Sequence, residues 1–158
     1  MPFKYDNSVV LVFARAPQSG RVNTRLIPAI GEKAATQLQH ELIHQRLASL
    51  TAAGLCHIRL MCTPDTRHPC FQHCRTRYPV SLEPQRGVDL GERMSTGVAQ
   101  ACEHWRNVIV LGTDAPALTP LMIESAISPA ANGAASAGTG RRRWLCNDCY
   151  APALSRAV

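Results

Sequence analysis

Short apolar runs that alternate with helical patterns are the feature that most constrains the fold of this chain. Ser8–Ala14 and Asn107–Leu111 are continuously apolar and rich in valine, leucine and isoleucine, which is typical of parallel strands buried on both faces. His57–Cys62 and Tyr78–Leu82 predict two more strands. Pro79 places the latter run at a strand beginning or a sheet edge, because proline has no N–H to donate.

Between these runs, apolar residues recur at the spacing of a helix. The longest predicted helix extends from Glu32 to about Ala53 and ends at Gly54, which suits the left-handed position after a helix. Shorter helices are predicted over residues 66–76, 89–104 and 120–127. This alternation predicts an α/β fold with a mainly parallel sheet.

Composition and charge narrow the class of protein. A chain of 158 residues is the length of one domain. No apolar run approaches the roughly 18 residues of a membrane span, and the N-terminus lacks the apolar region of a signal peptide, so no membrane association and a cytoplasmic location are expected. The seven cysteines are odd in number and irregularly spaced, which favours free thiols.

The basic balance of the chain does not favour nucleic acid as a partner. Half of the net charge of +6 lies in residues 134–158, where four arginines and one aspartate give a balance of +3. Only 5% of residues are aromatic, so base-stacking surfaces are scarce. The sequence indicates no particular oligomeric state.

An arginine-rich loop follows the first predicted strand. Phe13–Leu26 carries Arg15, Arg21 and Arg25, with Gly20 allowing close approach of the backbone to a ligand. Ligands of such sheets bind at the carboxyl ends of the strands, and a guanidinium group matches two phosphate oxygens at once. The loop therefore predicts a phosphate site, with a solvated basic loop as the alternative.

One carboxylate follows the fourth predicted strand in the same way. Asp114 stands in Gly112–Pro120, directly after an apolar run. Mg²⁺ and Mn²⁺ prefer oxygen ligands, and Mg²⁺ usually combines one or two carboxylates with substrate phosphates. Asp114 is thus a candidate metal ligand. The alternative is a turn aspartate, since Asp-Ala-Pro is good turn chemistry.

A second polar loop precedes the helix predicted from residue 89. Glu83–Met94 contains two glycines, two arginines and three acidic residues. It could close over a nucleotide or sugar. In the alternative interpretation, Asp89 caps the helix and Glu92 completes a capping box, and both roles are compatible because they use different atoms.

Cysteine and histidine residues raise a zinc hypothesis. Cys70–Cys74 and Cys146–Cys149 could supply four or five ligands, but only the second has CxxC spacing, and one such pair is weak support. His40, His44 and His104 are expected on helix surfaces rather than as ligands or bases.

Three ordered segments together resemble the DUF2064 family, also called the selenodomain-associated transferase 1 type. They are Phe13–Leu26, Pro84–Met94 and Gly112–Thr119, and the resemblance extends over residues 8 to about 127. The family is grouped with the GT-A nucleotide-diphospho-sugar transferases, near the molybdopterin and phospholactate nucleotidyltransferases. The resemblance implies a Rossmann-like GT-A three-layer sandwich.

The resemblance also implies roles for individual residues. Asp114 would be the catalytic and metal-binding aspartate, with Mg²⁺ or Mn²⁺ as cofactor. Asn23 stands where members of the family usually carry lysine, so one phosphate-binding charge is missing. The implied nucleotide- and phosphate-binding residues are Arg15, Gly20, Arg21, Thr24, Arg25, Gln85, Asp89, Gly91 and Arg93.

The sequence departs from the family after about residue 130. Members continue into a strand and a Gly-Pro-Ala-[Asp/Glu]-Asp-Gly-Gly-Tyr segment, whereas this chain has Gly138–Cys149. A permitted choice of codons for Gly138–Cys149, read one base later, encodes Gly-Pro-Ala-Asp-Asp-Gly-Gly-Tyr. We therefore expect a partial GT-A-like domain over residues 1–130, lacking the C-terminal part of its sheet, and a frameshifted, non-native or disordered tail over 131–158.

The implied activity is metal-dependent transfer of a glycosyl group from a nucleotide-activated small-molecule donor. Two alternatives stay open: nucleotidyl transfer of the molybdopterin or phospholactate guanylyltransferase type, and a nucleotide- or phosphate-binding module without catalysis. A small zinc protein is a further hypothesis. Because the acidic segment is missing, weak or no turnover is expected of this chain.

Overall fold

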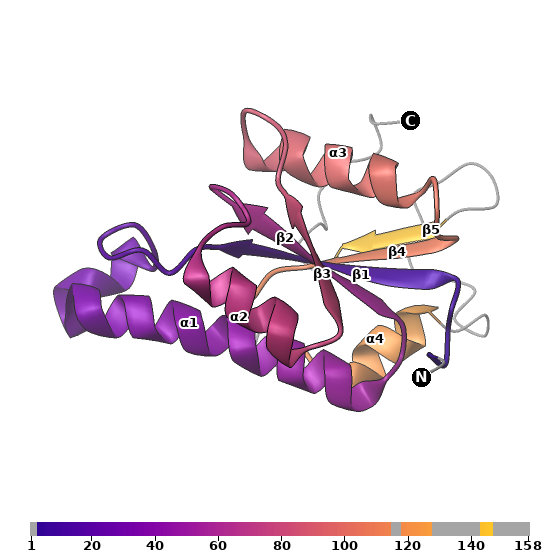
Figure 1. The fold of residues 1–158 in the computed structure, drawn as a ribbon, viewed down its shortest axis with the longest axis horizontal. Helices are drawn as coiled ribbons and strands as arrows, with labels where there is room; N and C mark the ends of the chain where they lie inside the picture. Colours follow the sequence, from indigo (N-terminus) through magenta and orange to yellow (C-terminus); the bar gives the residue numbers. More distant parts are fainter. Residues whose placement is uncertain (1–2, 115–117, 128–142, 147–158) are drawn as a thin grey trace.

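The fold is built on a five-stranded sheet in which every strand pair is parallel. A computed structural model describes residues 3–114, 118–127 and 143–146, and shows the strand order β3-β2-β1-β4-β5 (Figure 1). The strands are β1 (Ser8–Arg15), β2 (His57–Thr63), β3 (Val80–Pro84), β4 (Asn107–Leu111) and β5 (Arg143–Cys146).

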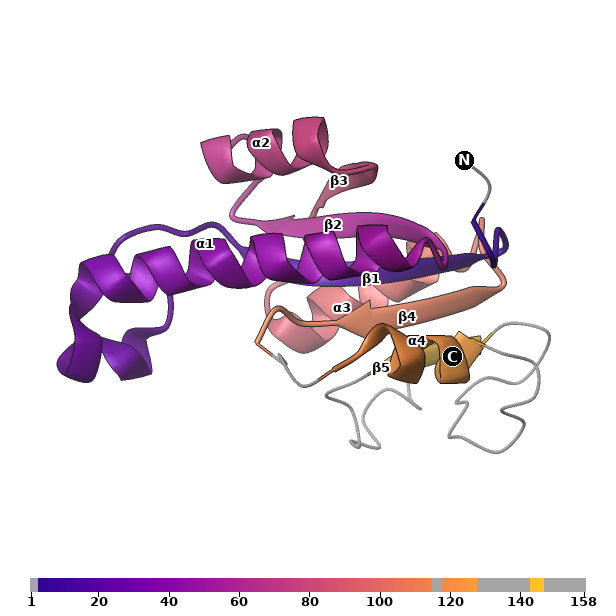
Figure 2. The ribbon, with the colours of Figure 1, turned by 90° about the horizontal axis from the view of Figure 1, so that it is seen from below.

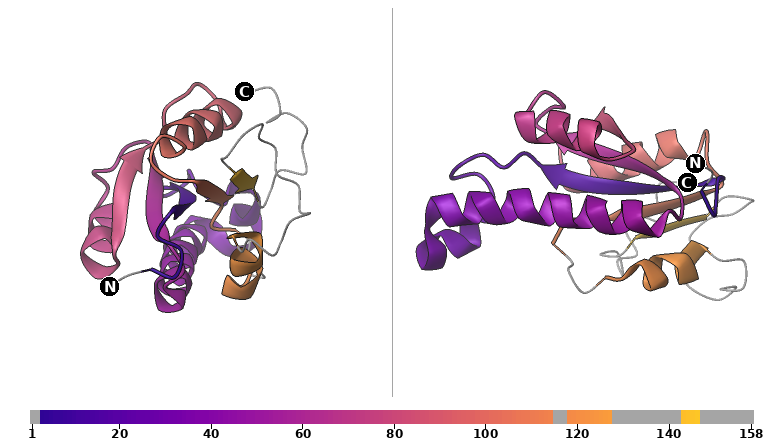
Figure 3. Two further views of the ribbon diagram at one scale, coloured as in Figure 1. Left: turned by 90° about the vertical axis from the view of Figure 1, so that its right-hand side faces the viewer. Right: turned by 60° about the horizontal axis from the view of Figure 1, so that its bottom comes forward.

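Helices cover both faces of this sheet. They are α1 (Ile27–Ala53), α2 (Pro69–Arg77), α3 (Leu90–Ala101) and α4 (Pro120–Ile127), with a short 3₁₀ helix η1 (Thr24–Leu26) before α1. Helices α1, α2 and α4 lie on one face and α3 lies on the other (Figure 3). The predicted α/β three-layer sandwich with a parallel sheet is thereby confirmed.

Strand β1 is the centre of the core. Val9, Val10, Leu11 and Val12 have no exposed surface, so the strand is covered on both faces as its apolar run predicts. Alternate side chains join two clusters: Val10 and Val12 pack with α1, α2 and α4, whereas Val9 and Leu11 pack with α3.

Glycine conformation explains the ends of α1. Gly31 has φ 84° and ψ 164°, which interrupts the helix and separates its first turn from the rest (Figure 2). Regular helix therefore resumes at about Glu32, where the sequence predicts its start. Gly54 has φ 59°, the left-handed conformation predicted for the residue after the helix.

The third strand begins two residues later than predicted. Helix α2 continues to Arg77, and Tyr78 closes it by donating its N–H to the Cys74 carbonyl. Pro79 has no N–H for the ladder, so pairing with β2 starts at Val80.

The fifth strand was not predicted. Arg143–Cys146 pairs in parallel with β4, with Ile109 opposite Leu145, although the sequence predicts no strand after residue 130. The rest of the predicted tail, 131–142 and 147–158, lies outside the described residues, and the division of the chain at residue 130 remains a prediction.

The cysteines agree with the expectation of free thiols. No disulfide links the five cysteines whose side chains the structure describes, and burial raises the pKa of Cys56 and of Cys62 to about 12, so both thiols are protonated. Within the described part of the chain, no helix has the length and apolar character needed to cross a membrane.

We predict that Gly97→Leu destabilises the protein by about 1–3 kcal/mol, the usual cost of overpacking a core. A Cβ at Gly97 would lie 3.2 Å from Phe13 Cζ and 3.3 Å from Met61 Cε, so α3 would be pushed off the sheet. Urea unfolding should show the loss, whereas Ala99→Leu, on the exposed side of α3, should change stability little. Equal stability of the two variants would contradict the packing of α3.

Candidate functional site at the carboxyl edge of the sheet

The parallel topology brings the three polar segments to one edge of the sheet. In the register, Arg15 lies opposite Thr63, Cys62 lies opposite Pro84, and Val12 lies opposite Leu111. The arginine loop leaves β1, the second polar loop leaves β3, and Asp114 follows β4, all at this edge (Figure 1).

The arginine loop is held by its backbone and by neutral side chains. The Ala16 N–H donates to the Thr63 carbonyl at 2.8 Å, and the buried Gln39 amide of α1 donates to the Arg15 carbonyl at 2.9 Å. The Ser19 hydroxyl donates to the Glu32 carboxylate at 3.0 Å, and Gly20 has φ 74°. The loop therefore keeps its shape without engaging its arginines in ion pairs.

The arginines of this loop are open to solvent. Arg15, Arg21 and Arg25 are all exposed, as is Thr24. The Arg15 side chain donates a hydrogen bond to the Arg21 carbonyl at 3.3 Å. Within the described residues, neither ion pair of the chain involves these three cations, so their guanidinium groups are available to an anion.

Asn23 has a structural role at the position where the resemblance leads one to expect lysine. Its φ of 49° is left-handed, a conformation that asparagine tolerates better than lysine. Its side-chain amide donates to the Ala35 carbonyl at 3.0 Å. The substitution thus ties the loop to α1 rather than supplying charge.

The second loop ends in the predicted cap of α3. The Asp89 carboxylate accepts the Glu92 N–H at 2.8 Å, and the Glu92 carboxylate accepts the Val88 N–H at 3.3 Å. The capping interpretation is confirmed, with Glu92 reaching one residue further back than in the usual box. Gly91 is exposed in the first helical turn, and Val88 is 86% exposed.

Gln85 is engaged within the protein. Its side-chain amide donates to the Met61 carbonyl at 2.8 Å and to the Ala14 carbonyl at 3.3 Å, and its N–H donates to the Cys62 carbonyl at 2.9 Å. Gln85 thus joins the ends of β1 and β2, which leaves only its side-chain oxygen for a ligand.

Arg93 also stabilises the second loop. Its Nε donates to the Gly87 carbonyl at 3.0 Å and its Nη1 to the Thr63 hydroxyl at 3.4 Å. Gly87 has φ 144°, and a Cβ there would lie 2.8 Å from the backbone nitrogen of Arg93. Glycine is therefore required for this close approach. Arg93 therefore connects the loop to the end of β2.

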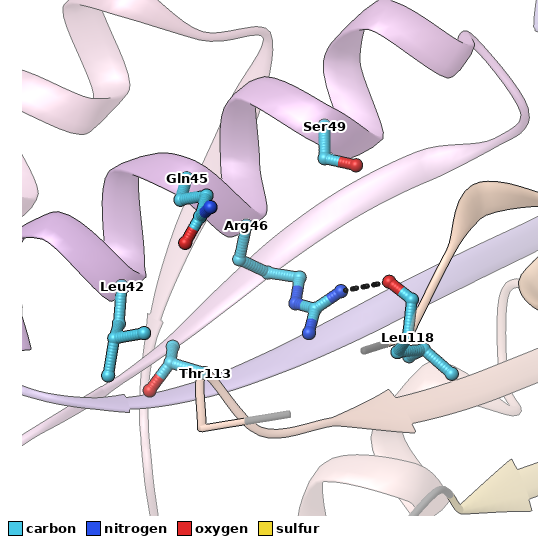
Figure 4. Close-up of a pocket in the computed structure, with 6 residues that line it drawn as sticks. All are labelled: Leu42, Gln45, Arg46, Ser49, Thr113 and Leu118. Carbon is cyan, nitrogen blue, oxygen red and sulfur yellow. Dashed lines mark hydrogen bonds between the residues drawn. The ribbon is translucent and has the colours of Figure 1, made fainter. Parts of the chain in front are cut away.

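Asp114 is exposed and lies near a buried arginine that sequence reasoning did not select. Arg46 of α1 donates to the Leu118 carbonyl at 3.1 Å in a cavity of about 140 Å³ that Thr113 also lines (Figure 4). Burial lowers the pKa of Arg46, and attraction to Asp114 opposes that shift. The sequence feature that could have identified Arg46 is its position within the apolar stripe of the predicted helix.

Comparison with known proteins decides the family. A family model described as an uncharacterized protein conserved in bacteria (DUF2064) matches residues 46–140, more than half of the chain. The chain belongs to the DUF2064 family. The match spans the second loop and Asp114 of this DUF2064 protein, whereas its arginine loop precedes the matched residues.

A solved structure shares the fold of this DUF2064 protein. It is a protein from Desulfovibrio desulfuricans G20, solved at 1.90 Å and provisionally named a nucleotide-diphospho-sugar transferase, with a TM-score of 0.68 and 24% identity. The likeness covers 77% of the present chain but 53% of the other, so this chain spans about half the length of that relative. No curated protein matches the chain.

We predict that Gln85→Met destabilises this DUF2064 protein by about 1–2 kcal/mol, because carbonyls at the ends of β1 and β2 lose a donor. Thermal or urea unfolding gives the loss, and Gln100→Met on the exposed surface of α3 is the matched control. A Gln85→Met protein as stable as this control, yet defective in ligand binding, would instead assign Gln85 to ligand contact.

Proposed function

We propose that the carboxyl edge of the sheet binds the diphosphate of a nucleotide-activated donor, and that the site serves metal-dependent transfer of its glycosyl group. The observation that carries the proposal is the convergence of three exposed arginines and Asp114 at one sheet edge. The name of the structurally similar Desulfovibrio protein supports the donor class. A cytoplasmic location remains part of this proposal.

The arginine loop is the proposed phosphate site. Arg15, Arg21 and Arg25 are exposed and outside the ion pairs of the described residues, so a diphosphate need not displace an acidic partner. Gly20 and Thr24 are also exposed and could approach the same phosphates through a backbone N–H and a hydroxyl. Charge-assisted hydrogen bonds would then hold the donor.

The second loop is the proposed wall of the site beside the nucleoside or sugar. The carboxylates of Asp89 and Glu92 are used in the helix cap and Arg93 in loop contacts. Contacts from this loop would therefore come mainly from its backbone around Gly91 and from the exposed side chains of Val88 and Leu90. An apolar surface of this kind suits a base or a sugar ring better than a phosphate.

Asp114 fits a Mg²⁺ or Mn²⁺ ion that is completed by the donor. In the described residues, Asp114 belongs to no group of three metal-ligating side chains, so the donor and water would supply most of the ligands. Such ions commonly combine one or two carboxylates with substrate phosphates and water. When bound, the ion would neutralise charge that develops on the leaving diphosphate.

Nucleotidyl transfer is the alternative reaction for the same site. Both reactions use a nucleotide, a divalent ion and cationic groups around phosphates, but they release different products. Incubation with nucleotide sugars or nucleoside triphosphates separates them: glycosyl transfer releases a nucleoside diphosphate, whereas nucleotidyl transfer releases pyrophosphate.

We predict that Arg25→Ala weakens binding of a nucleoside diphosphate in the presence of Mn²⁺ by about tenfold or more, the value of one charge-assisted hydrogen bond. Calorimetric titration measures the change. Arg106→Ala is the control, because Arg106 precedes β4 and lies at the opposite end of the sheet. Equal weakening by both substitutions would indicate only a general charge effect and would reject the arginine loop as the phosphate site.

We predict that Asp114→Asn removes the Mn²⁺-dependent part of donor binding while the arginine loop still binds the diphosphate. Titrations with and without Mn²⁺ measure this part, and any turnover should disappear with it. Metal-dependent binding that survives in Asp114→Asn would refute the metal role. Binding by the unsubstituted chain without any turnover would favour the non-catalytic module.

The reading frame around the tail provides a separate prediction. Sequencing the gene through codons 128–158 and beyond should reveal Gly-Pro-Ala-Asp-Asp-Gly-Gly-Tyr in the frame one base later, followed by several tens of open codons. A different or immediately closed frame would show that Gly138–Cys149 is native, and the zinc hypothesis for Cys146 and Cys149 would gain support.

A further inference from the structure

A cluster of soft ligands joins α1 to α2. His40 and His44 are one turn apart on α1, and Cys70 is in the first turn of α2. One potential ligand atom from each of the three residues lies within 4.8 Å of the other two. Both histidines are half-buried, whereas the sequence had led us to expect them on the helix surface. Cys70 is buried.

The hydrogen bonds of His44 prepare one ring nitrogen for a ligand. The Tyr78 hydroxyl donates to the His44 carbonyl at 3.3 Å, which leaves its oxygen to accept from His44 Nδ1 at 3.0 Å. In this tautomer Nε2 carries the lone pair. That atom is buried and has no hydrogen-bond partner among the described residues, although buried polar atoms are normally satisfied.

The sulfur of Cys70 also has a supporting contact. The Cys74 thiol donates a hydrogen bond to the Cys70 sulfur. Ligating thiols are deprotonated, and ligating histidines usually donate their other ring N–H to a neighbour. Cys74 and Tyr78 thus occupy the positions of outer partners to Cys70 and His44.

A cavity opens beside the cluster. Its volume is about 370 Å³, and its lining includes His40, Cys70, Pro17 and His73. The ring of His73, exposed on α2 one turn after Cys70, lies 5.6 Å from that of His44. An ion could therefore enter from solvent, with His73 beside its path.

We propose that His40, His44 and Cys70 form a zinc site that links α1 to α2, with His44 binding through Nε2 and His73 at the open side. This site is separate from the donor site and does not depend on the proposed function. It shares only Cys70 and the neighbouring His73 with the zinc ligands considered from the sequence, and it needs neither Cys146 nor Cys149.

The ligand set favours Zn²⁺ over Mg²⁺. Two imidazoles and a thiolate are nitrogen and sulfur ligands, which zinc binds and magnesium does not favour. Zinc bonds of about 2.0–2.3 Å in tetrahedral geometry place ligand atoms roughly 3.5 Å apart. The three atoms lie within 4.8 Å of one another, so they would have to close by about 1.3 Å or less, a movement that side-chain rotation supplies.

Zinc titration of the full chain tests the proposal. Protein stripped with a chelator should bind one equivalent of Zn²⁺ at this site in competition with a chromophoric chelator, and Zn²⁺ should raise the midpoint of thermal unfolding. His44→Gln, His40→Gln and Cys70→Ser should each weaken this binding at least tenfold. His104→Gln, on an exposed residue away from the cluster, should leave it unchanged.

The tail cysteines need their own control. The double substitution Cys146→Ser/Cys149→Ser should retain the zinc site and, with Co²⁺ as a probe, the thiolate charge-transfer absorption, which Cys70→Ser should abolish. Circular dichroism without metal verifies that each variant is folded, and the half-buried His40 provides a test that leaves Cys70 in place. Retained binding in folded His40→Gln and His44→Gln, or no binding by the unsubstituted chain, would overturn the proposal.

Tyr78→Phe tests the assigned outer contact. Loss of the hydroxyl should weaken Zn²⁺ about tenfold, the lower end of the effect of removing such a partner, and should release the fixed tautomer of His44, which nitrogen NMR of the imidazole reports. If Tyr78→Phe changes neither the affinity for Zn²⁺ nor the tautomer of His44, Tyr78 does not prepare His44 Nε2 for zinc.

Discussion

Two glutamine amides fix the end of the central strand, and the candidate site depends on them. Gln39 from α1 donates to the Arg15 carbonyl, and Gln85 from the second loop donates to the Ala14 carbonyl. These are the last two residues of β1, where the arginine loop begins. Neutral donors from two different elements therefore set where the loop starts, and the cationic side chains remain open to solvent.

Helix α1 organises most of the polar features of the protein. Besides Gln39, it contains His40 and His44, which lie beside Cys70 of α2, and Arg46, which contacts the segment after β4. These residues occur within two turns of a helix whose other buried positions pack on the sheet. A single long helix thus supports the arginine loop, the proposed zinc site and the surroundings of Asp114 at once.

Local patterns in the sequence predicted most of the fold. The apolar runs predicted four strands to within two residues, and Gly54 and Asp89 ended and began helices as expected, because these features depend on neighbouring residues. The contact of Arg46 with Leu118, the hydrogen bonds of Gln85 to the strand ends and the pairing of His44 with Tyr78 escaped prediction, since their partners are 24 to 72 residues away. The strand Arg143–Cys146 was missed because its short segment lacks a periodic pattern of its own.

The backbone of the second loop has a consequence for how its sequence can vary. Gly87 admits no Cβ, because such an atom would lie 2.8 Å from the backbone nitrogen of Arg93. The next residue, Val88, is 86% exposed. A position that tolerates no side chain thus adjoins one that tolerates almost any. In a diversified library of this loop, Gly87 should remain fixed while Val88 varies freely, so new ligand preferences could evolve at the tip without loss of the scaffold.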